Sequence, residues 1–487
     1  MKTKNTFILL TNKINRNLKY IYLFLVSPII LFQIFFTPPF QTPDSPNNFN
    51  RAYQVSNFRL IGSLRKNLSG GYINSNMISL ESIFNNLPFH YNNKVTEDQL
   101  VKAYSYKWHQ NNKPEMYTFA SFPNTSVYPP FAYLPQALAI KLGRLENFSI
   151  LTTYRLSLLS VSLLAVIITY VALSLGSQLS IAIFVTATLP MVTCLYAAIE
   201  ADALLISAGL LLAAIIAKGI YSSFYHRHIT IILFILVTFL AIQKPPYIGL
   251  ELLFFIPSFS VSASVSYNLL KRLFLASISS IIVISWIVYA KLLAWTNIDP
   301  NHKSLISHIY FVLHNPYALI SMFARTLESQ SGSYYSQMVG VLGWLDTPLP
   351  KWYYTTALIA LAVTAIMTSL KVKFTDWLFI SLSISTSIVM VFVALYADWS
   401  PVHTKIIDGV QGRYFLPILP LTFMITAPII FYFINTAKIV TGYMHIKLIK
   451  YEQQTKFIAM TLLYFLFPIV SYVVTVGALI YRYYLAK

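Results

Sequence analysis

An aspartate surrounded by prolines follows the first long apolar segment of the sequence. The apolar run covers residues 20–36, Asp44 comes soon after it, and prolines occupy positions 38, 39, 43 and 46. Proline fixes φ and disfavours the helical region for the residue before it, so the segment is expected to be extended and the carboxylate fixed in place. A carboxylate held at the outer surface of a bilayer is suited to accept the proton of a hydroxyl group. Asp44 is therefore the candidate catalytic base, the alternative being an aspartate in a turn or at a helix cap.

Several cations could hold the phosphate of a substrate. Arg413 lies where the outer turn 397–412 enters an apolar segment, and its guanidinium offers a bidentate fork that matches phosphate oxygens. Lys244 precedes two prolines between short apolar stretches, where a charge needs a partner or a cavity. Arg51 could pair with Asp44 or with phosphate, and Lys405 shares the turn of Arg413. The alternatives are an interfacial arginine at 413 and a lysine on a surface turn at 244.

Other polar and aromatic residues are candidates for binding a sugar or an acceptor. Glu200 and Asp202 bracket a tight outer turn, where carboxylates can hold a cation or sugar hydroxyls, although a solvated turn has the same composition. The remaining candidates, each with an ordinary surface role as its alternative, are Tyr53, Tyr128, Gln411, His403 and Asp398. Trp108, Trp344 and Trp352 are further candidates for stacking on sugar rings.

The sequence gives little support for a cofactor. Cys194 is the single cysteine, which excludes an intrachain disulfide and a cysteine-cluster metal site, and its apolar surroundings predict a packing residue. The sequence has no Walker motif, no His-Glu-x-x-His and no Gly-x-Gly-x-x-Gly. We expect no metal ligands and no bound cofactor; a role for Mg²⁺ stays open without ligands to support it.

The composition is that of a polytopic membrane protein. Of 487 residues, 56% are hydrophobic and 10% are charged, and the mean hydropathy is +0.61. Soluble domains contain about 25% charged residues. A net charge of +19 would suggest nucleic acid as the partner of a soluble domain. Here the charge is expected in loops between spans, so we predict contact with membrane lipid and no nucleic-acid partner.

We predict an all-α integral membrane protein with about eleven transmembrane helices, taking roughly 20 residues per span. The spans are 20–36, 151–174, 179–198, 203–219, 229–243, 247–265, 273–294, 353–370, 376–396, 413–436 and 457–481, and Lys244-Pro245-Pro246 indicates short or broken helices around 229–265. Basic residues before the first span and in alternate loops, such as Lys271 and Lys371, place the N-terminus in the cytoplasm of a bacterial inner membrane. The first span lacks a small-x-small cleavage site, and the odd count places Lys487 outside.

Two long segments form an extracytoplasmic layer. The chain divides into the N-terminus with the first span (1–37), a first outer loop (38–150), spans (151–294), a second outer loop (295–352) and C-terminal spans (353–487). Both loops are expected to carry interfacial amphipathic helices, including a short one between Met77 and Leu87. All acidic residues except Asp376, Glu452 and Glu251 fall in outer segments, which directs the functional face outward.

Three groups of residues carry a resemblance to a known family. They are Pro43-Asp44, Pro46, Phe49 and Arg51-Ala52-Tyr53-Gln54; Tyr128-Pro129-Pro130 with Tyr133-Leu134-Pro135-Gln136-Ala137; and Gln411-Gly412-Arg413-Tyr414-Phe415-Leu416-Pro417. Over about residues 20–435 the chain resembles a bacterial family of membrane proteins that is similar to GT-C-type glycosyltransferases. In overall plan it also resembles phage-encoded serotype-converting O-antigen glucosyltransferases. Ser45 and Asn48 stand where the family usually has Glu and His, which puts a metal-binding version of the site in doubt.

The resemblance implies a periplasmic, inverting transfer of a hexose such as glucose. The donor would be a polyprenyl-phosphate sugar, and the acceptor a hydroxyl of a lipid-linked or surface polysaccharide such as O-antigen, with Asp44 as the base. The alternatives are a flippase or transporter of lipid-linked sugars and a polysaccharide polymerase or ligase. The oligomeric state is left open. One geometric expectation carries this interpretation: Asp44 and Arg413 must meet at the outer rim of one cavity.

Overall fold

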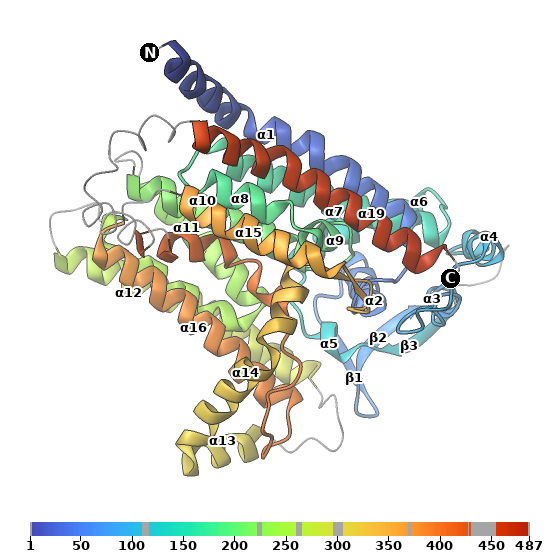
Figure 1. The fold of residues 1–487 in the computed structure, drawn as a ribbon. Helices are drawn as coiled ribbons and strands as arrows, with labels where there is room; N and C mark the ends of the chain where they lie inside the picture. The colour runs from blue at the N-terminus through green and yellow to red at the C-terminus, as the bar shows by residue number, and fades with distance from the viewer. Residues whose placement is uncertain are drawn as a thin grey trace.

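The protein is a bundle of long helices with a smaller layer at one end (Figure 1). The structure, a computed structural model, describes residues 2–109, 116–221, 226–259, 265–295, 305–368, 372–426, 428–429 and 454–485. The long helices are α1 (Lys2–Phe36), α7 (Ile150–Ser174), α10 (Asp202–Tyr221), α11 (His226–Gln243), α12 (Val265–Leu293), α15 (Lys351–Met367), α16 (Phe374–Trp399) and α19 (Phe467–Tyr483). The N-terminal helix α1 lies beside the C-terminal helix α19.

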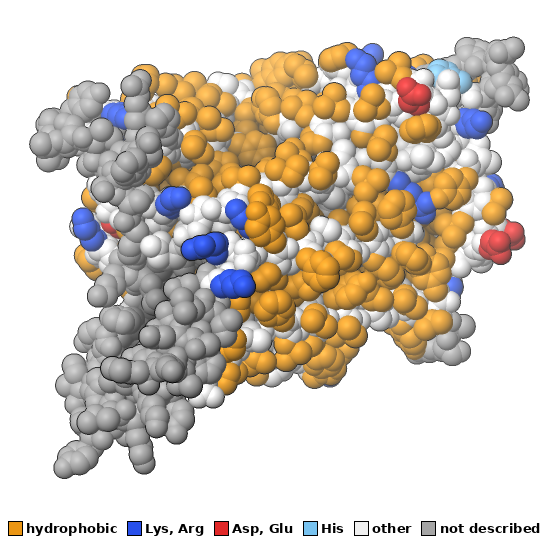
Figure 2. Space-filling model, turned by 90° about the horizontal axis from the view of Figure 1, so that it is seen from above, with side chains coloured by type: hydrophobic (Ala, Val, Ile, Leu, Met, Phe, Trp, Pro, Cys, Tyr) orange, Lys and Arg blue, Asp and Glu red, His pale blue; other side chains and the backbone are white. Residues whose placement is uncertain are grey.

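Six helical segments in the described residues are long and apolar enough to cross a membrane. They are Lys13–Phe36, Ile150–Ser174, Asp202–Ile220, Asn268–Leu293, Phe374–Trp399 and Gln454–Tyr483, with shorter apolar helices at Ile229–Gln243 and Lys351–Met367. Large apolar side chains of α12 face outward, among them Ile281 and Leu292 at 62% and 73% exposed. Figure 2 shows hydrophobic side chains over much of one face of the molecule. Together these features support a multi-pass membrane protein.

Two of the eleven predicted spans are broken in the structure. Residues 179–198 form two short helices, α8 (Ser180–Ala187) and α9 (Pro190–Tyr196), because Pro190 has no N–H and cannot continue the preceding helix. Residues 247–265 begin as a long 3-10 helix, η2 (Pro245–Phe255), followed by the short η3 (Pro257–Phe259). The predicted break at Lys244-Pro245-Pro246 is confirmed. Residues 427 and 430–436 of the predicted span 413–436, together with Lys371, lie outside the described residues.

The first outer loop contains a small β-sheet that the prediction of amphipathic helices missed. Its helices are α2 (Ser45–Ser56), α3 (Ser75–Ser82), α4 (Glu97–Ser105), α5 (Pro123–Ser126), η1 (Phe131–Tyr133) and α6 (Leu134–Leu145). Strands β1 (Ser63–Arg65), β2 (Leu68–Asn74) and β3 (Tyr117–Ser121) pair antiparallel in the order β1-β2-β3. Tyr72 pairs with Phe119 across the sheet. The short helix predicted between Met77 and Leu87 corresponds to α3, which starts and ends earlier.

The second outer loop contributes α13 (Leu305–His314), α14 (Pro316–Gly340) and the short strands β4 (Val341–Leu342) and β5 (Thr347–Pro348). The turn between these strands is joined to the end of α19. Arg482 is fully buried; its Nη2 lies 2.9 Å from Oδ2 of Asp346 and 2.6 Å from the carbonyl oxygen of Leu87. The N–H of Val95 donates to the carbonyl of Tyr483 at 3.0 Å. The end of α19 therefore belongs to the outer layer, opposite the N-terminal end of α1 (Figure 1).

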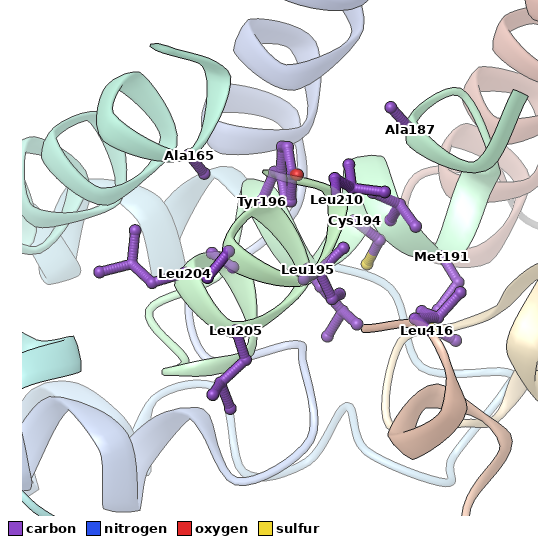
Figure 3. Packing of buried hydrophobic residues seen from close by; sticks show 14 of the residues in the cluster. Ala165, Ala187, Met191, Cys194, Leu195, Tyr196, Leu204, Leu205, Leu210 and Leu416 are labelled. Carbon is purple, nitrogen blue, oxygen red and sulfur yellow. The ribbon is translucent and has the colours of Figure 1, made fainter. Parts of the chain in front are cut away.

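The core lies where α8, α9 and α10 pack together. Figure 3 shows Cys194 of α9 among Met191, Leu195 and Leu416. Its thiol is buried and unpaired with any other cysteine, as predicted for a packing residue. The break between α9 and α10 follows directly, and it is this break that carries Glu200 and Asp202.

Candidate active site

Asp44 occupies a left-handed backbone position immediately before α2. Its φ is 58°, a region that aspartate tolerates better than most residues, and Pro43 and Pro46 restrict the chain on both sides. The carboxylate does not cap the helix. Instead its backbone carbonyl accepts hydrogen bonds from the N–H and the Nδ2 of Asn48, both at 2.9 Å. The backbone of Asp44 is thus fixed by hydrogen bonds from α2, and both oxygens of its carboxylate are available to contact other elements.

Arg413 lies in η4 (Gly412–Phe415), which is inserted between α14 and α10. A Cβ at Gly412 would come within 1.9 Å of the Tyr334 carbonyl oxygen, and a Cβ at Gly209 within 2.1 Å of the Pro417 carbonyl oxygen. Glycine is required at both positions because the backbones approach so closely. This packing buries the Arg413 side chain to 3% exposure and directs it toward Asp44.

Five charged side chains from four separate parts of the chain meet here; we call them the charge cluster. Arg413 Nη2 lies 3.4 Å from Asp44 Oδ2, and Arg413 Nη1 lies 2.5 Å from Glu200 Oε2 and 3.8 Å from Asp202 Oδ2. Lys244 Nζ lies 2.5 Å from Asp202 Oδ1. The predicted contact between Asp44 and Arg413 is present, but the predicted shared cavity rim is not, because Arg413 does not line the cavity described below. Asp44 is the most exposed carboxylate of the three, with 34% of its side chain accessible against 4% for Glu200 and 10% for Asp202.

Polar residues around the charge cluster fix its geometry. Gln411 Oε1 accepts from Arg413 Nε at 2.7 Å, so each guanidinium nitrogen of Arg413 has a partner. Asn124 Nδ2 donates to Asp44 Oδ1 at 3.2 Å. Tyr133 donates to Asn48 Oδ1 at 2.7 Å and so supports the amide that holds the Asp44 backbone. Asp44 is positioned through its backbone and both carboxylate oxygens.

Glu200 is buried beside Arg413, and one of its oxygens, Oε1, has no hydrogen-bond partner. The pKa of Glu200 is raised from 4.5 to about 8, chiefly by burial; Arg413 and Lys244 lower it, while Asp202 and Asp44 raise it. Burial disfavours the charged form of a carboxyl group, and the single guanidinium is shared by three acids. Burial therefore favours the protonated form of Glu200 in the folded protein.

This proton makes stability depend on pH. Between pH 4.5 and 8 the folded state keeps the Glu200 proton that the unfolded state has lost, so stability is greatest below this window and falls as pH rises through it. The slope attributable to Glu200 is at most about 1.4 kcal/mol per pH unit. We expect the Tm of the wild type to fall from pH 5 to pH 8 relative to that of Glu200→Gln, measured by thermal unfolding in detergent. Parallel curves for the two proteins would contradict this assignment, and Glu97→Gln, at an exposed position, is the control.

A cavity of about 440 Å³ opens beside the charge cluster and is lined by Asp44 and Lys244. Its walls come from α12 and α16, from η2 and from the segment around α5. The walls of α12 and α16 are mainly apolar, with Ile287, Ala290, Val391 and Leu395 among the lining residues. Tyr128 and Asp398, both predicted as sugar or acceptor contacts, also line it, whereas Arg413, Glu200 and Asp202 lie behind the wall. The cavity thus combines apolar walls with two carboxylates, those of Asp44 and Asp398, of which Asp44 belongs to the charge cluster.

Arg51 and Tyr53 do not reach this cavity. Arg51 is fully buried and donates to the carbonyl oxygens of Tyr128, Arg59 and Leu60, the first at 2.7 Å from Nη2, and to Gln54 Oε1. Its donors are thus used within the fold, contrary to the predicted phosphate contact. Tyr53 is buried against Trp108, with ring centroids 5.7 Å apart and planes at 8°, so neither ring is available to a sugar.

His403 and Lys405 lie on the exposed outer turn after α16, and neither lines the cavity. The His403 ring contacts Phe311 edge-on at 4.6 Å. Trp344 and Trp352 are also outside the cavity; the indole N–H of Trp344 donates to the Phe40 carbonyl. The structure therefore separates these residues from Asp44.

The cavity is lined by residues that the sequence did not single out. Trp286, Trp295 and Trp399 face it, together with Lys291, Tyr247 and Tyr414. The indole N–H of Trp286 donates to the Val127 carbonyl at 3.0 Å, and Lys244 Nζ lies 4.5 Å from the Tyr414 ring centroid. A sequence signal was present for two of the tryptophans: Trp295 and Trp399 adjoin the outer ends of predicted spans, but interfacial tryptophans have the same distribution.

Among the described residues, no group of three or more histidine, cysteine or acidic side chains is arranged to hold a metal ion. The three carboxylates of the charge cluster instead share Arg413 and Lys244. The arrangement presents a fixed, accessible carboxylate next to a cavity of mixed polarity, which suits proton abstraction from a bound hydroxyl.

Comparison with known proteins places the chain in a family. Residues 27–422 match the family model DUF2142, described as a predicted membrane protein. No curated protein and no solved structure matches the chain. The matched region contains the whole charge cluster and most of the described bundle. The chain therefore belongs to the DUF2142 family of membrane proteins.

Proposed function

We propose that the protein is a GT-C-like glycosyltransferase that moves a hexose such as glucose from a polyprenyl-phosphate donor to a hydroxyl of a lipid-linked or surface polysaccharide such as O-antigen. The observation that carries this proposal is the position of Asp44: an accessible carboxylate, held by Arg413 and Asn124, at the end of a cavity between two apolar helices. The apolar helices of the cavity suit a lipid chain, and the accessible carboxylate suits a hydroxyl group that must lose its proton.

The proposed reaction is a single inverting displacement. The acceptor oxygen attacks the anomeric carbon and forms the new glycosidic bond, while its proton passes to a carboxylate oxygen of Asp44. The bond between the anomeric carbon and the phosphate oxygen breaks, and the electron pair leaves with the polyprenyl phosphate. The departing phosphate needs a cation more than an acid. A double displacement would require a second carboxylate as nucleophile. Glu200 lies behind the cavity wall, and Asp398, the other acid that lines the cavity, is assigned here to binding of the sugar or acceptor.

The cavity walls suit a polyprenyl chain. The outer thirds of α12 and α16 contribute apolar side chains to the cavity, and the opposite side of α12 is exposed as a lipid-facing surface would be. We propose that the prenyl chain lies along these helices, in contact with their apolar side chains. The sugar would then lie near the tryptophans and tyrosines of the cavity, within reach of Asp44.

The proposed topology places the charge cluster on the periplasmic side of the bacterial inner membrane, with the N-terminus in the cytoplasm. Arg482 joins the end of α19 to the outer layer, so both lie on one side. We expect a C-terminal alkaline phosphatase fusion to be active and a C-terminal green fluorescent protein fusion to be dark, since these reporters work on opposite sides of the membrane. The reverse pattern would place the outer layer in the cytoplasm and contradict the topology. A fusion after Phe36, where α1 ends, is the matched control.

A transfer assay tests the proposed function directly. Purified protein in lipid nanodiscs is given a synthetic polyprenyl-phosphate glucose with a labelled sugar, and a lipid-linked oligosaccharide as acceptor. We expect labelled acceptor and free polyprenyl phosphate in equal amounts. Movement of intact donor across a proteoliposome membrane without release of polyprenyl phosphate would identify a flippase. Joining of oligosaccharide units without use of this donor would identify a polymerase or ligase.

A further inference from the structure

The cavity contains a cation that the proposed reaction has not used. Lys291 lies in the last turn of α12, within the stripe of that helix that lines the cavity. Ile287 and Lys291 are four residues apart in α12 and so lie along one face of this helix, and Trp295 follows just after the helix ends. Lys291 thus belongs to the cavity wall.

The charge of Lys291 is not matched by an acid in the described part of the chain. Its Nζ lies 5.4 Å from the ring centroid of Trp295, and none of the ion pairs between described residues includes it. Lys244, the other lysine of the cavity, is paired with Asp202 at 2.5 Å. An anion that enters an apolar cavity needs a counter-charge, because an unpaired charge is costly there. Lys291 can supply this counter-charge without first breaking an ion pair with a carboxylate.

Arg413 is differently placed. Its side chain is 3% exposed, it does not line the cavity, and all of its nitrogens contact Gln411, Glu200 or Asp44. To bind a phosphate in the cavity, the Arg413 guanidinium would have to break these contacts and move through the cavity wall. The same contacts hold one guanidinium edge against the Asp44 carboxylate, which is what a positioning residue for the base requires.

We propose that Lys291 binds the phosphate of the polyprenyl-linked donor at the outer end of α12, and that Arg413 positions Asp44 and does not contact the phosphate. This inference rests on the proposed function. The donor phosphodiester carries one negative charge, and the polyprenyl phosphate that leaves carries up to two. A fixed cation therefore binds the product more tightly than the donor and favours departure of the leaving group.

A lysine in the last turn of a spanning helix also has two ordinary uses. It interacts favourably with the helix dipole, and its side chain reaches toward lipid headgroups. Neither use requires a cavity, and neither distinguishes a polyprenyl phosphate from an uncharged polyprenol. Selectivity for phosphate is consequently the property to measure.

The test compares binding of labelled polyprenyl monophosphate and of the corresponding polyprenol to full-length protein in nanodiscs of uncharged lipid. The variants are Lys291→Gln, Lys291→Arg and, as the matched control, Lys351→Gln, an exposed lysine at the start of α15 that does not line the cavity. We expect Lys291→Gln to weaken binding of the phosphate about tenfold and to leave polyprenol binding unchanged, about tenfold being 1.4 kcal/mol. Lys291→Arg and Lys351→Gln should stay within about threefold of the wild type. In the transfer assay, Lys291→Gln should raise KM for the donor.

Each other outcome overturns the inference or the function beneath it. Unchanged phosphate binding by Lys291→Gln would remove Lys291 from the site. Equal losses of phosphate and polyprenol would assign it a packing role. If Lys291→Gln binds polyprenyl phosphate as tightly as the wild type does, and the wild type transfers sugar, the inference about Lys291 fails and the proposed function stands. If the wild type neither binds polyprenyl phosphate nor transfers sugar, the proposed function itself fails.

Discussion

Asp44→Asn is expected to reduce sugar transfer by about 10³-fold or more while leaving binding of polyprenyl phosphate within about threefold, because a positioned base typically contributes 10²–10⁴-fold to the rate. The carboxamide has nearly the same shape but cannot accept the proton of the attacking hydroxyl. Asparagine also tolerates the left-handed backbone at this position, where φ is 58°, so the local fold should be kept. The measurement is kcat in the transfer assay together with the Kd for polyprenyl monophosphate.

Asp408→Asn is the matched control for this prediction. Asp408 is an exposed carboxylate on the outer turn after α16 and does not line the cavity. Its replacement should leave kcat within about twofold, since isolated surface substitutions have small effects. Normal turnover by Asp44→Asn would remove Asp44 as the base, even if the enzyme class were correct.

The second large effect is expected from Arg413. Arg413→Gln removes the cation shared by Glu200, Asp202 and Asp44, and breaking a buried ion pair by removing one partner costs about 3–5 kcal/mol. We expect a clear fall in Tm and a loss of transfer activity. The stability loss alone would account for inactivity, so this variant does not separate a structural role from a positioning role.

Arg413→Lys makes that separation. A lysine keeps the charge but lacks the planar fork that reaches Gln411, Glu200 and Asp44 together. We expect a smaller fall in Tm than for Arg413→Gln, a kcat lower by about 10²-fold and unchanged binding of polyprenyl monophosphate, because a misplaced group of an active site can cost about that factor. Weakened phosphate binding with normal kcat would instead make Arg413 a phosphate ligand.

The sequence was sufficient to predict that Asp44 and Arg413 meet, although 369 residues separate them. The prolines around position 44 identified Asp44, and its position at the end of an outer turn identified Arg413. The resemblance to a known family then assigned both residues to one site. Burial of Glu200 was not predictable in the same way. A tight turn with two acids has the same composition whether water or an arginine surrounds it, and the difference arises only when η4 packs behind the turn.

Arg51 and the helix count show where residue patterns are ambiguous. The Arg-Ala-Tyr-Gln run identified a fixed segment, but its arginine is satisfied by backbone carbonyls that no sequence pattern specifies. Apolar runs of suitable length predicted a span at 179–198, which Pro190 breaks, and one at 247–265, where the predicted break at Lys244-Pro245-Pro246 is followed by a 3-10 helix. The sheet β1-β2-β3 was missed because its strands are short and Gly70 and Gly71 weaken the strand pattern.

The contact between Arg482 and the outer layer has a consequence for biosynthesis. The carbonyl of Leu87 is made 395 residues before the arginine that binds it. During translation the first outer loop therefore emerges without the guanidinium that later binds the Leu87 carbonyl, and the second outer loop emerges without the guanidinium that pairs with Asp346. Assembly of this layer is completed only when the last helix has been inserted. A chain whose translation stops before Arg482 therefore contains Asp44 and Arg413 but lacks the contacts of Arg482 with Asp346 and Leu87.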